Sequence, residues 1–287
     1  MCGGRAHTYH LSHTWLGRVA QAASATRPAY RTEPAGGGSP RRDLDGPAAP
    51  RPGHRRTSAR GRVPAHGLDY LTLLRHELAA FQERLSGDLT APVGHCGRWT
   101  LRDLAEHVGQ GNLWVVAAVR ERHGAHEPPP APADIVAWFA ATSRLLAETL
   151  AVDPATGAWT FAPPRTVGFW RRRRWLETLV HRWDAQRALG VPDELDAVQC
   201  ADGVAEVVEV FVPRQVRLGR MPAPAAAVRF TATDLGTSWT IGPGEPVAAL
   251  RGTAPELLLA LWNRLPWTRL AGDAGRARAV LPGPLVP

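Results

Sequence analysis

Apolar residues recur at steps of three and four along four stretches of the chain, which is the period of an amphipathic helix. One face of each such helix would be buried and the other would meet solvent. The pattern predicts helices that run from about Leu68 to Phe81, from Leu101 to Val119, from Ile135 to Leu150 and from Phe169 to Leu189.

The predicted helix boundaries carry specific signals. Thr100 and Asp103 have the spacing of a capping box, in which each side chain accepts a hydrogen bond from the other residue's backbone N–H. Asp134 is placed to cap the third helix, and Gly190 with Pro192 ends the fourth. Four helices with a Pro-rich crossover predict a four-helix bundle over residues 67–192.

The chain changes character after residue 192. Asp202 to Phe211 has the pattern of a helix, whereas Ala227 to Thr233 alternates between apolar and polar residues as a strand does. A return strand over 238–241, a third strand over 247–251 and a helix capped by Thr253 would follow. We therefore predict an α+β fold overall, with a small α+β domain over 193–287 whose Ala271-Gly-Asp273 is a turn and whose Pro-rich end frays.

Residues 1–66 are rich in Gly, Pro, Arg, Ser and Ala, show no sustained period, and are predicted to be disordered. They hold 11 Arg and 3 acidic residues, which equals the whole net charge of +8. The remainder is balanced, with 23 basic and 23 acidic residues, so the charge does not indicate a nucleic-acid-binding fold. Either this segment is an Arg-rich arm for polyanions or, as we favour, it is a dispensable extension.

Further classes are excluded by what the sequence lacks. It contains no lysine, which excludes Schiff-base and P-loop chemistry. No apolar run approaches the length of a membrane span, and the first residues do not resemble a secretory signal. Three widely separated cysteines form neither a disulfide framework nor a CxxC motif, which favours a reducing cytoplasm.

Candidate chemistry lies in the fourth predicted helix. Glu177 and His181 are four residues apart, so their side chains share one helix face, beside an apolar strip on which a lone charge is costly to bury. A divalent metal would satisfy both side chains, although such pairs are also common on solvated faces. His107, on the inward side of the second helix, is the candidate third ligand, and without this pairing a core histidine would be the better interpretation.

Three neighbouring features leave alternatives open. The run Arg171–Arg174 is either an anion-binding rim or a solvated helix start. Asp184 either orients a metal ligand or pairs with a nearby Arg. Cys96, just ahead of the second helix, is assigned a packing role rather than that of a nucleophile.

Two segments together resemble the mycothiol-dependent maleylpyruvate isomerase family. They are Cys96-Gly-Arg-Trp-Thr-Leu-Arg-Asp-Leu-Ala-Glu-His107 and Glu177-Thr-Leu-Val-His-Arg-Trp-Asp184, and the stretch from Val247 to Asp273 is similar to that family's small C-terminal domain. The resemblance covers residues 68 to about 275. One departure is the loop before the second helix, which reads Cys-Pro-Gly-Trp-Thr in the family and Cys96-Gly-Arg-Trp-Thr100 here.

The resemblance implies a DinB-like bundle whose metal ligands fall on His107, Glu177 and His181. It also implies mycothiol, a low-molecular-weight thiol of actinobacteria, as cofactor. Zinc is the first choice of metal for two imidazoles and a carboxylate, although nickel, cobalt or iron also fits. The expected function is a metal-activated thiol reaction on a small electrophile, either cis–trans isomerisation or thiol transfer, with no nucleic acid or membrane as partner. A non-catalytic metal- or ligand-binding regulatory protein is the alternative.

Overall fold

The computed structural model describes residues 67–191 and 193–287. The extension over residues 1–66 lies outside the described residues, so the prediction that it is disordered stays a prediction. The predicted domain limits of 67–192 and 193–287 stay predictions, since residue 192 itself is not described.

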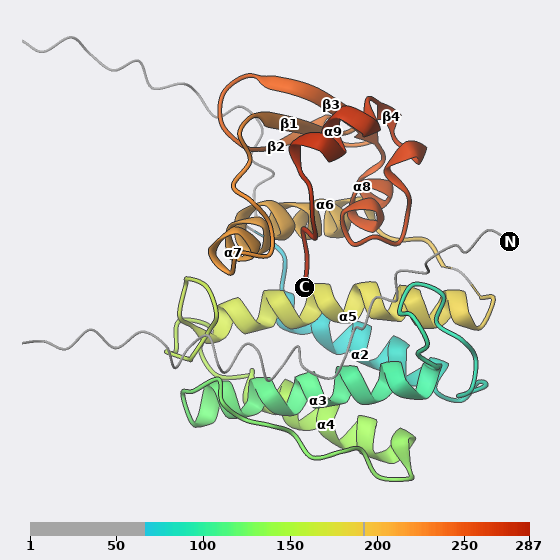
Figure 1. The fold of residues 1–287 in the computed structure, drawn as a ribbon. Helices are drawn as coiled ribbons and strands as arrows, with labels where there is room; N and C mark the ends of the chain where they lie inside the picture. Colours follow the sequence, from blue (N-terminus) through green and yellow to red (C-terminus); the bar gives the residue numbers. More distant parts are fainter. Residues whose placement is uncertain (1–66, 192) are drawn as a thin grey trace, which may run out of the picture.

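The first part of the described chain is a bundle of four helices (Figure 1). Helix α2 packs against α5 and α4, and α3 packs against the same two helices, so the four close around one core. The bounds are α2 (Tyr70–Arg84), α3 (Leu101–Arg120), α4 (Ile135–Thr149) and α5 (Val167–Ala188).

The predicted caps of the second and third helices are confirmed. The Asp103 N–H donates to Thr100 Oγ1 at 3.3 Å and the Thr100 N–H donates to Asp103 Oδ2 at 2.8 Å, which is the capping box. The Ala137 N–H donates to Asp134 Oδ1 at 3.0 Å at the start of α4. These caps satisfy amide groups that the first helical turn leaves without partners.

The C-terminal part combines helices with a mixed sheet. Its strands are ordered β2-β1-β3-β4, with β1 antiparallel to β2, parallel to β3, and β3 antiparallel to β4. Helices α8 and α9 pack against the sheet and α8 also packs on α6. The bounds are α6 (Ala197–Glu206), η1 (Val207–Phe211), α7 (Val212–Arg217), β1 (Ala227–Ala232), β2 (Thr237–Ile241), β3 (Pro246–Gly252), α8 (Ala254–Leu261), η2 (Trp267–Arg269), β4 (Ala271–Gly272) and α9 (Ala274–Val280).

The fold class is confirmed, and three details of the prediction are wrong. The helix placed at 202–211 begins earlier, and its last residues form a π-helical turn that leads into α7. The predicted turn at 271–273 contains a short strand because Ala271 pairs with Arg251 of β3. The end of the chain does not fray: α9 follows, and Leu285 and Val286 are buried.

Helix α5 lies where the two parts meet (Figure 1). Helices α6, α7 and α8 are stacked on its outer side, between the bundle and the sheet (Figure 1). Among the described helices, none has the length and apolar character required to cross a membrane.

Candidate functional site

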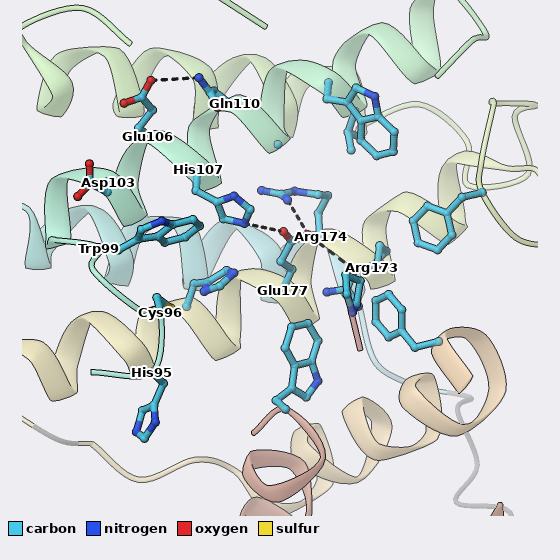
Figure 2. A pocket seen from close by; sticks show the side chains of 18 of the residues that line it. His95, Cys96, Trp99, Asp103, Glu106, His107, Gln110, Arg173, Arg174 and Glu177 are labelled. Carbon is cyan, nitrogen blue, oxygen red and sulfur yellow. Dashed lines mark hydrogen bonds and ion pairs between the residues drawn. The ribbon is translucent and has the colours of Figure 1, made fainter. Parts of the chain in front are cut away.

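The three predicted metal ligands come together at one place in the structure. His107 projects from α3 toward Glu177 of α5 (Figure 2). His181 follows Glu177 by one turn of the same helix. One potential ligand atom of each side chain lies within 4.8 Å of the other two. The Nε2 atom of His107 is 3.6 Å from Oε1 of Glu177. The packing of α3 on α5 thus joins residues that are about seventy positions apart.

The surroundings of this cluster suit a cation. Glu177 and His181 are buried and His107 is half-buried. Two imidazole nitrogens and one carboxylate oxygen form a donor set typical of zinc and of neighbouring divalent metals. A buried group of this kind is costly unless it is paired, and a bound cation would provide the compensation.

Asp184 holds His181 from the side opposite the cluster. The Nδ1 atom of His181 lies 3.1 Å from Oδ2 of Asp184, so Nδ1–H donates and Nε2 is left as the metal-facing atom. Arg264, after α8, donates from Nε to Oδ1 at 3.0 Å and from Nη2 to Oδ2 at 2.6 Å of the same carboxylate. Asp184 therefore pairs with an arginine, as one alternative predicted, and also contacts a predicted metal ligand, while its role in orienting that ligand stays a prediction.

The same groups set the charge state around His181. Burial lowers the pKa of His181, which favours the neutral imidazole that a metal requires. Burial would raise the pKa of Asp184, but hydrogen bonds from His181 and Arg264 hold it below its ordinary value. His181 is thus favoured as a neutral imidazole and Asp184 as an ionised carboxylate.

Arg174 keeps Glu177 ionised. Its Nη1 donates to Glu177 Oε2 at 2.7 Å, while Nη2 donates to the Val108 carbonyl at 3.0 Å and to Asn112 Oδ1 at 2.7 Å. Burial would raise the pKa of Glu177, yet the adjacent Arg174 and the hydrogen bond to His107 hold it well below 4.5. A carboxylate that stays charged when buried is a strong ligand for a cation.

The predicted run Arg171–Arg174 is not a solvated helix start, and its alternative role as an anion-binding rim stays a prediction for Arg173 and Arg174, which line the cavity described below and of which Arg173 has a buried Nη2 atom without a hydrogen-bond partner among the described residues. Arg171 donates to the carbonyls of Leu150 and Val152, and Arg174 is committed to the bundle core. The two central members reach α6 in the C-terminal part: Arg172 to Asp202, and Arg173 to Glu206. The four charges therefore fasten α5 to its neighbours.

Cys96 has the packing role that was predicted. It is buried, and its Sγ lies 3.8 Å from Asp184 Oδ2 and 3.5 Å from Arg264 Nη2. Burial and the nearby Asp184 carboxylate raise the pKa of this thiol to about 12. A thiol that stays protonated at neutral pH is a poor nucleophile.

A cavity of about 310 Å³ opens beside the three-residue cluster. Its floor is formed by the cluster and by Arg173 and Arg174, and its sides come from α3, the segment before α3, and the C-terminal part (Figure 2). Six aromatic side chains line it: Trp99, Trp114, Phe161, Trp170, Phe211 and Trp262. A small molecule in this space would contact the cluster on one side and aromatic rings on the other.

Sequence reasoning missed the residues that support the site. Arg264 is 80 positions from its partner Asp184, so no local spacing connects them. Asn112 lies within a helix whose buried face is mainly apolar, and Glu206 is one of two acidic residues on α6. One signal was available: Arg174 precedes Glu177 by three residues, the spacing at which oppositely charged side chains meet on a helix.

Comparison with known proteins gives the same fold and family. Residues 71–186 match the family model described as the mycothiol maleylpyruvate isomerase N-terminal domain, and residues 199–282 match the C-terminal domain of that family. No similar protein was found among curated sequences.

Two solved structures share the fold. One is a point mutant of the mycothiol-dependent maleylpyruvate isomerase, with 13% identity, a TM-score of 0.55, and coverage of 72% of this chain and 92% of that chain. The other is the unmutated isomerase, with 14% identity, a TM-score of 0.52 and the same coverage. With both domain models matched in order and the fold shared across both parts, the chain belongs to the mycothiol-dependent maleylpyruvate isomerase family.

Proposed function

We propose that this protein is a thiol-dependent metalloenzyme that holds a divalent cation, with zinc as first choice, on His107, Glu177 and His181. Its cofactor would be mycothiol and its substrate a small electrophile, converted by cis–trans isomerisation or by thiol transfer. The single observation that carries the proposal is the convergence of three ligand atoms within 4.8 Å beside a cavity. Three protein ligands with space beside them are typical of catalytic rather than structural zinc.

The chain's own residues would prepare the site in three ways. Asp184 fixes which nitrogen of His181 faces the cation, and Arg174 keeps Glu177 ionised before any metal arrives. The aromatic walls would limit the access of water to a bound substrate, which would strengthen electrostatic interactions inside the cavity. Cys96, with its pKa raised to about 12, would not compete with an external thiol.

A cation bound there would stabilise a coordinated thiol in its thiolate form. The thiol would supply the nucleophile for addition to a polarised double bond. If the new S–C bond is kept, the reaction is a thiol transfer. If that bond breaks again after rotation about the former double bond, the reaction is an isomerisation. Family membership supports the mycothiol assignment for both outcomes.

Metal analysis of the purified protein is the decisive experiment. Wild type is expected to carry about one equivalent of metal per chain, and His107→Ala and His181→Ala are each expected to lose it. His76→Ala is the matched control, because the His76 side chain is 75% exposed on α2, outside the site. Equal metal content in all four proteins would refute the proposed ligand set.

Turnover separates the enzyme from the alternative of a metal- or ligand-binding regulatory protein. The metal-loaded protein is expected to consume maleylpyruvate or an electrophilic probe only when mycothiol is present. If metal-free and metal-loaded proteins are equally inert with mycothiol, the enzyme proposal is wrong, and bound metal without turnover would leave the regulatory function. The cytoplasmic location stays a prediction from cysteine usage.

A further inference from the structure

Every guanidinium in the described wall of the cavity is already matched by a carboxylate. Three arginines line the space, and each is buried or nearly so, which makes an unmatched charge costly. Their partners come from α5 and from α6, so both parts of the molecule contribute to the balance. The pairs are Arg173 with Glu206, Arg174 with Glu177, and Arg264 with Asp184.

Two further carboxylates line the cavity without such a partner. Asp103 is engaged by Thr100 at the start of α3, and Glu106 accepts hydrogen bonds from Gln110 Nε2 at 3.1 Å and from the Ala131 N–H at 3.1 Å. Within residues 67–191 and 193–287, neither carboxylate forms an ion pair. The charged side chains of the wall, counted together with Glu206 and Asp184 as the partners of Arg173 and Arg264, therefore have a formal excess of two negative charges.

A divalent cation on the predicted ligands would bring this excess to about zero. A thiolate placed beside the cation would return one negative charge to the site. No surplus positive charge is then left for the carboxylates of a substrate, and moving an unpaired anion out of water into such a space is strongly unfavourable.

Five of the aromatic rings that line the cavity form a continuous chain of contacts. Phe211 lies 5.8 Å from Trp262 and 6.2 Å from Phe161, and Trp170 lies 5.7 Å from Phe161 and 5.2 Å from Trp114, measured between ring centroids. Face and edge contacts from such rings favour flat, apolar molecules. The π-helical turn of α6 brings Phe211 into this wall, where the Arg173 guanidinium covers its ring at 4.7 Å.

We propose that the substrate of this site is an uncharged α,β-unsaturated electrophile with a flat apolar body, rather than a dicarboxylate. The inference rests on the proposed thiol chemistry, which it restricts to one substrate class. In the addition, the S–H bond breaks, an S–C bond forms at the β carbon, and the displaced π pair takes up the proton at the α carbon. Thiol and alkene thus give one thioether, and no other reactant is needed.

The test compares the binding of three ligands that have the same shape and different net charges. Dimethyl phthalate, monomethyl phthalate and phthalate carry zero, one and two negative charges on the same planar frame, and none adds a thiol. Calorimetric titration at pH 8 uses full-length protein in two forms: metal-free, and zinc-loaded with mycothiol present. The diester is expected to bind at least about tenfold more tightly than phthalate in both forms. Equal or tighter binding of phthalate by the loaded form overturns the inference.

A matched pair of variants tests the charge argument directly. Glu206→Gln removes the carboxylate that balances Arg173 and should tighten binding of monomethyl phthalate about tenfold. Asp202→Asn makes the same change on the same helix, but its partner Arg172 does not line the cavity, so affinity should be unchanged. No gain in Glu206→Gln contradicts the argument. If circular dichroism shows that this variant is not folded, the binding of the three ligands to the wild-type protein decides whether the inference holds.

Failure of the inference and failure of the proposed function are distinguishable. Thiol-dependent turnover together with preferred binding of phthalate refutes only the substrate class. Absence of turnover with every electrophile, together with preferred binding of the diester, refutes only the enzyme.

Discussion

Asp184 and Arg264 form a two-pronged ion pair, with N–O distances of 3.0 and 2.6 Å, across the boundary between the bundle and the C-terminal domain. The same carboxylate accepts from His181 at 3.1 Å. One side of the cluster of predicted metal ligands is thus held by a residue 80 positions later in the chain. The C-terminal domain is therefore part of the site's support and not an appendage.

Asp184→Asn should weaken metal binding about 10- to 100-fold, because an amide can present its N–H to His181 and no longer fixes the imidazole orientation. Competition with a fluorescent chelator measures the affinity. Asp193→Asn is the control, because that exposed carboxylate is 3.6 Å from Arg182 and outside the cavity. Unchanged affinity in Asp184→Asn would show that the ion pair does not support the metal ligands.

Gly111→Ala should destabilise the protein and disturb Glu177. A Cβ atom at Gly111 would lie 2.6 Å from Nη1 of Arg174, the nitrogen that donates to Glu177. Overpacking of this kind costs about 1–3 kcal/mol, measured by chemical denaturation.

Gly157→Ala is the control for that substitution, because no atom lies within 4 Å of a Cβ there. Its stability should be unchanged or slightly raised, since alanine restricts the unfolded chain. Equal stability of the two variants would mean that Arg174 moves aside without cost.

Cys96 should resist thiol reagents in the folded protein. Its pKa is raised to about 12 by burial and by Asp184, so the thiol stays protonated at pH 8, where an ordinary cysteine is partly ionised. Alkylation at pH 8 followed by peptide mass spectrometry should leave Cys96 unmodified in native protein and modified in denaturant. Rapid native alkylation would contradict the buried placement.

Anion binding should strengthen as the pH falls from 8 to 6. Burial raises the pKa of Glu206 to about 7, against the opposing effect of Arg173 and Arg172, so protonation in this range removes the charge that balances Arg173. Titrating monomethyl phthalate, which stays a monoanion throughout, measures the change. Glu206→Gln should lose this part of the pH dependence, and an identical profile in the variant would assign it to other groups such as the histidines.

Local signals in the sequence were enough to predict most of the fold. Periodicity and caps placed the bundle helices to within a few residues, because Thr100 with Asp103 and Asp134 act on their own first turns. The last strand and helix were missed, because Ala271-Gly272 is a strand only through its pairing with β3. The burial of the C-terminal residues Leu285 and Val286 was also missed, because it depends on contacts with residues distant in the sequence.

The sequence by itself determined the four bundle helices, the order of the two domains and the identity of three ligand candidates, because each depends on residues a few positions apart or on a motif. Only the tertiary structure decided how the charges of Arg173, Arg174 and Arg264 are matched and which rings enclose the cavity. Those features depend on long-range packing, and the free energy of a buried charge is set by neighbours that adjacent sequence does not reveal.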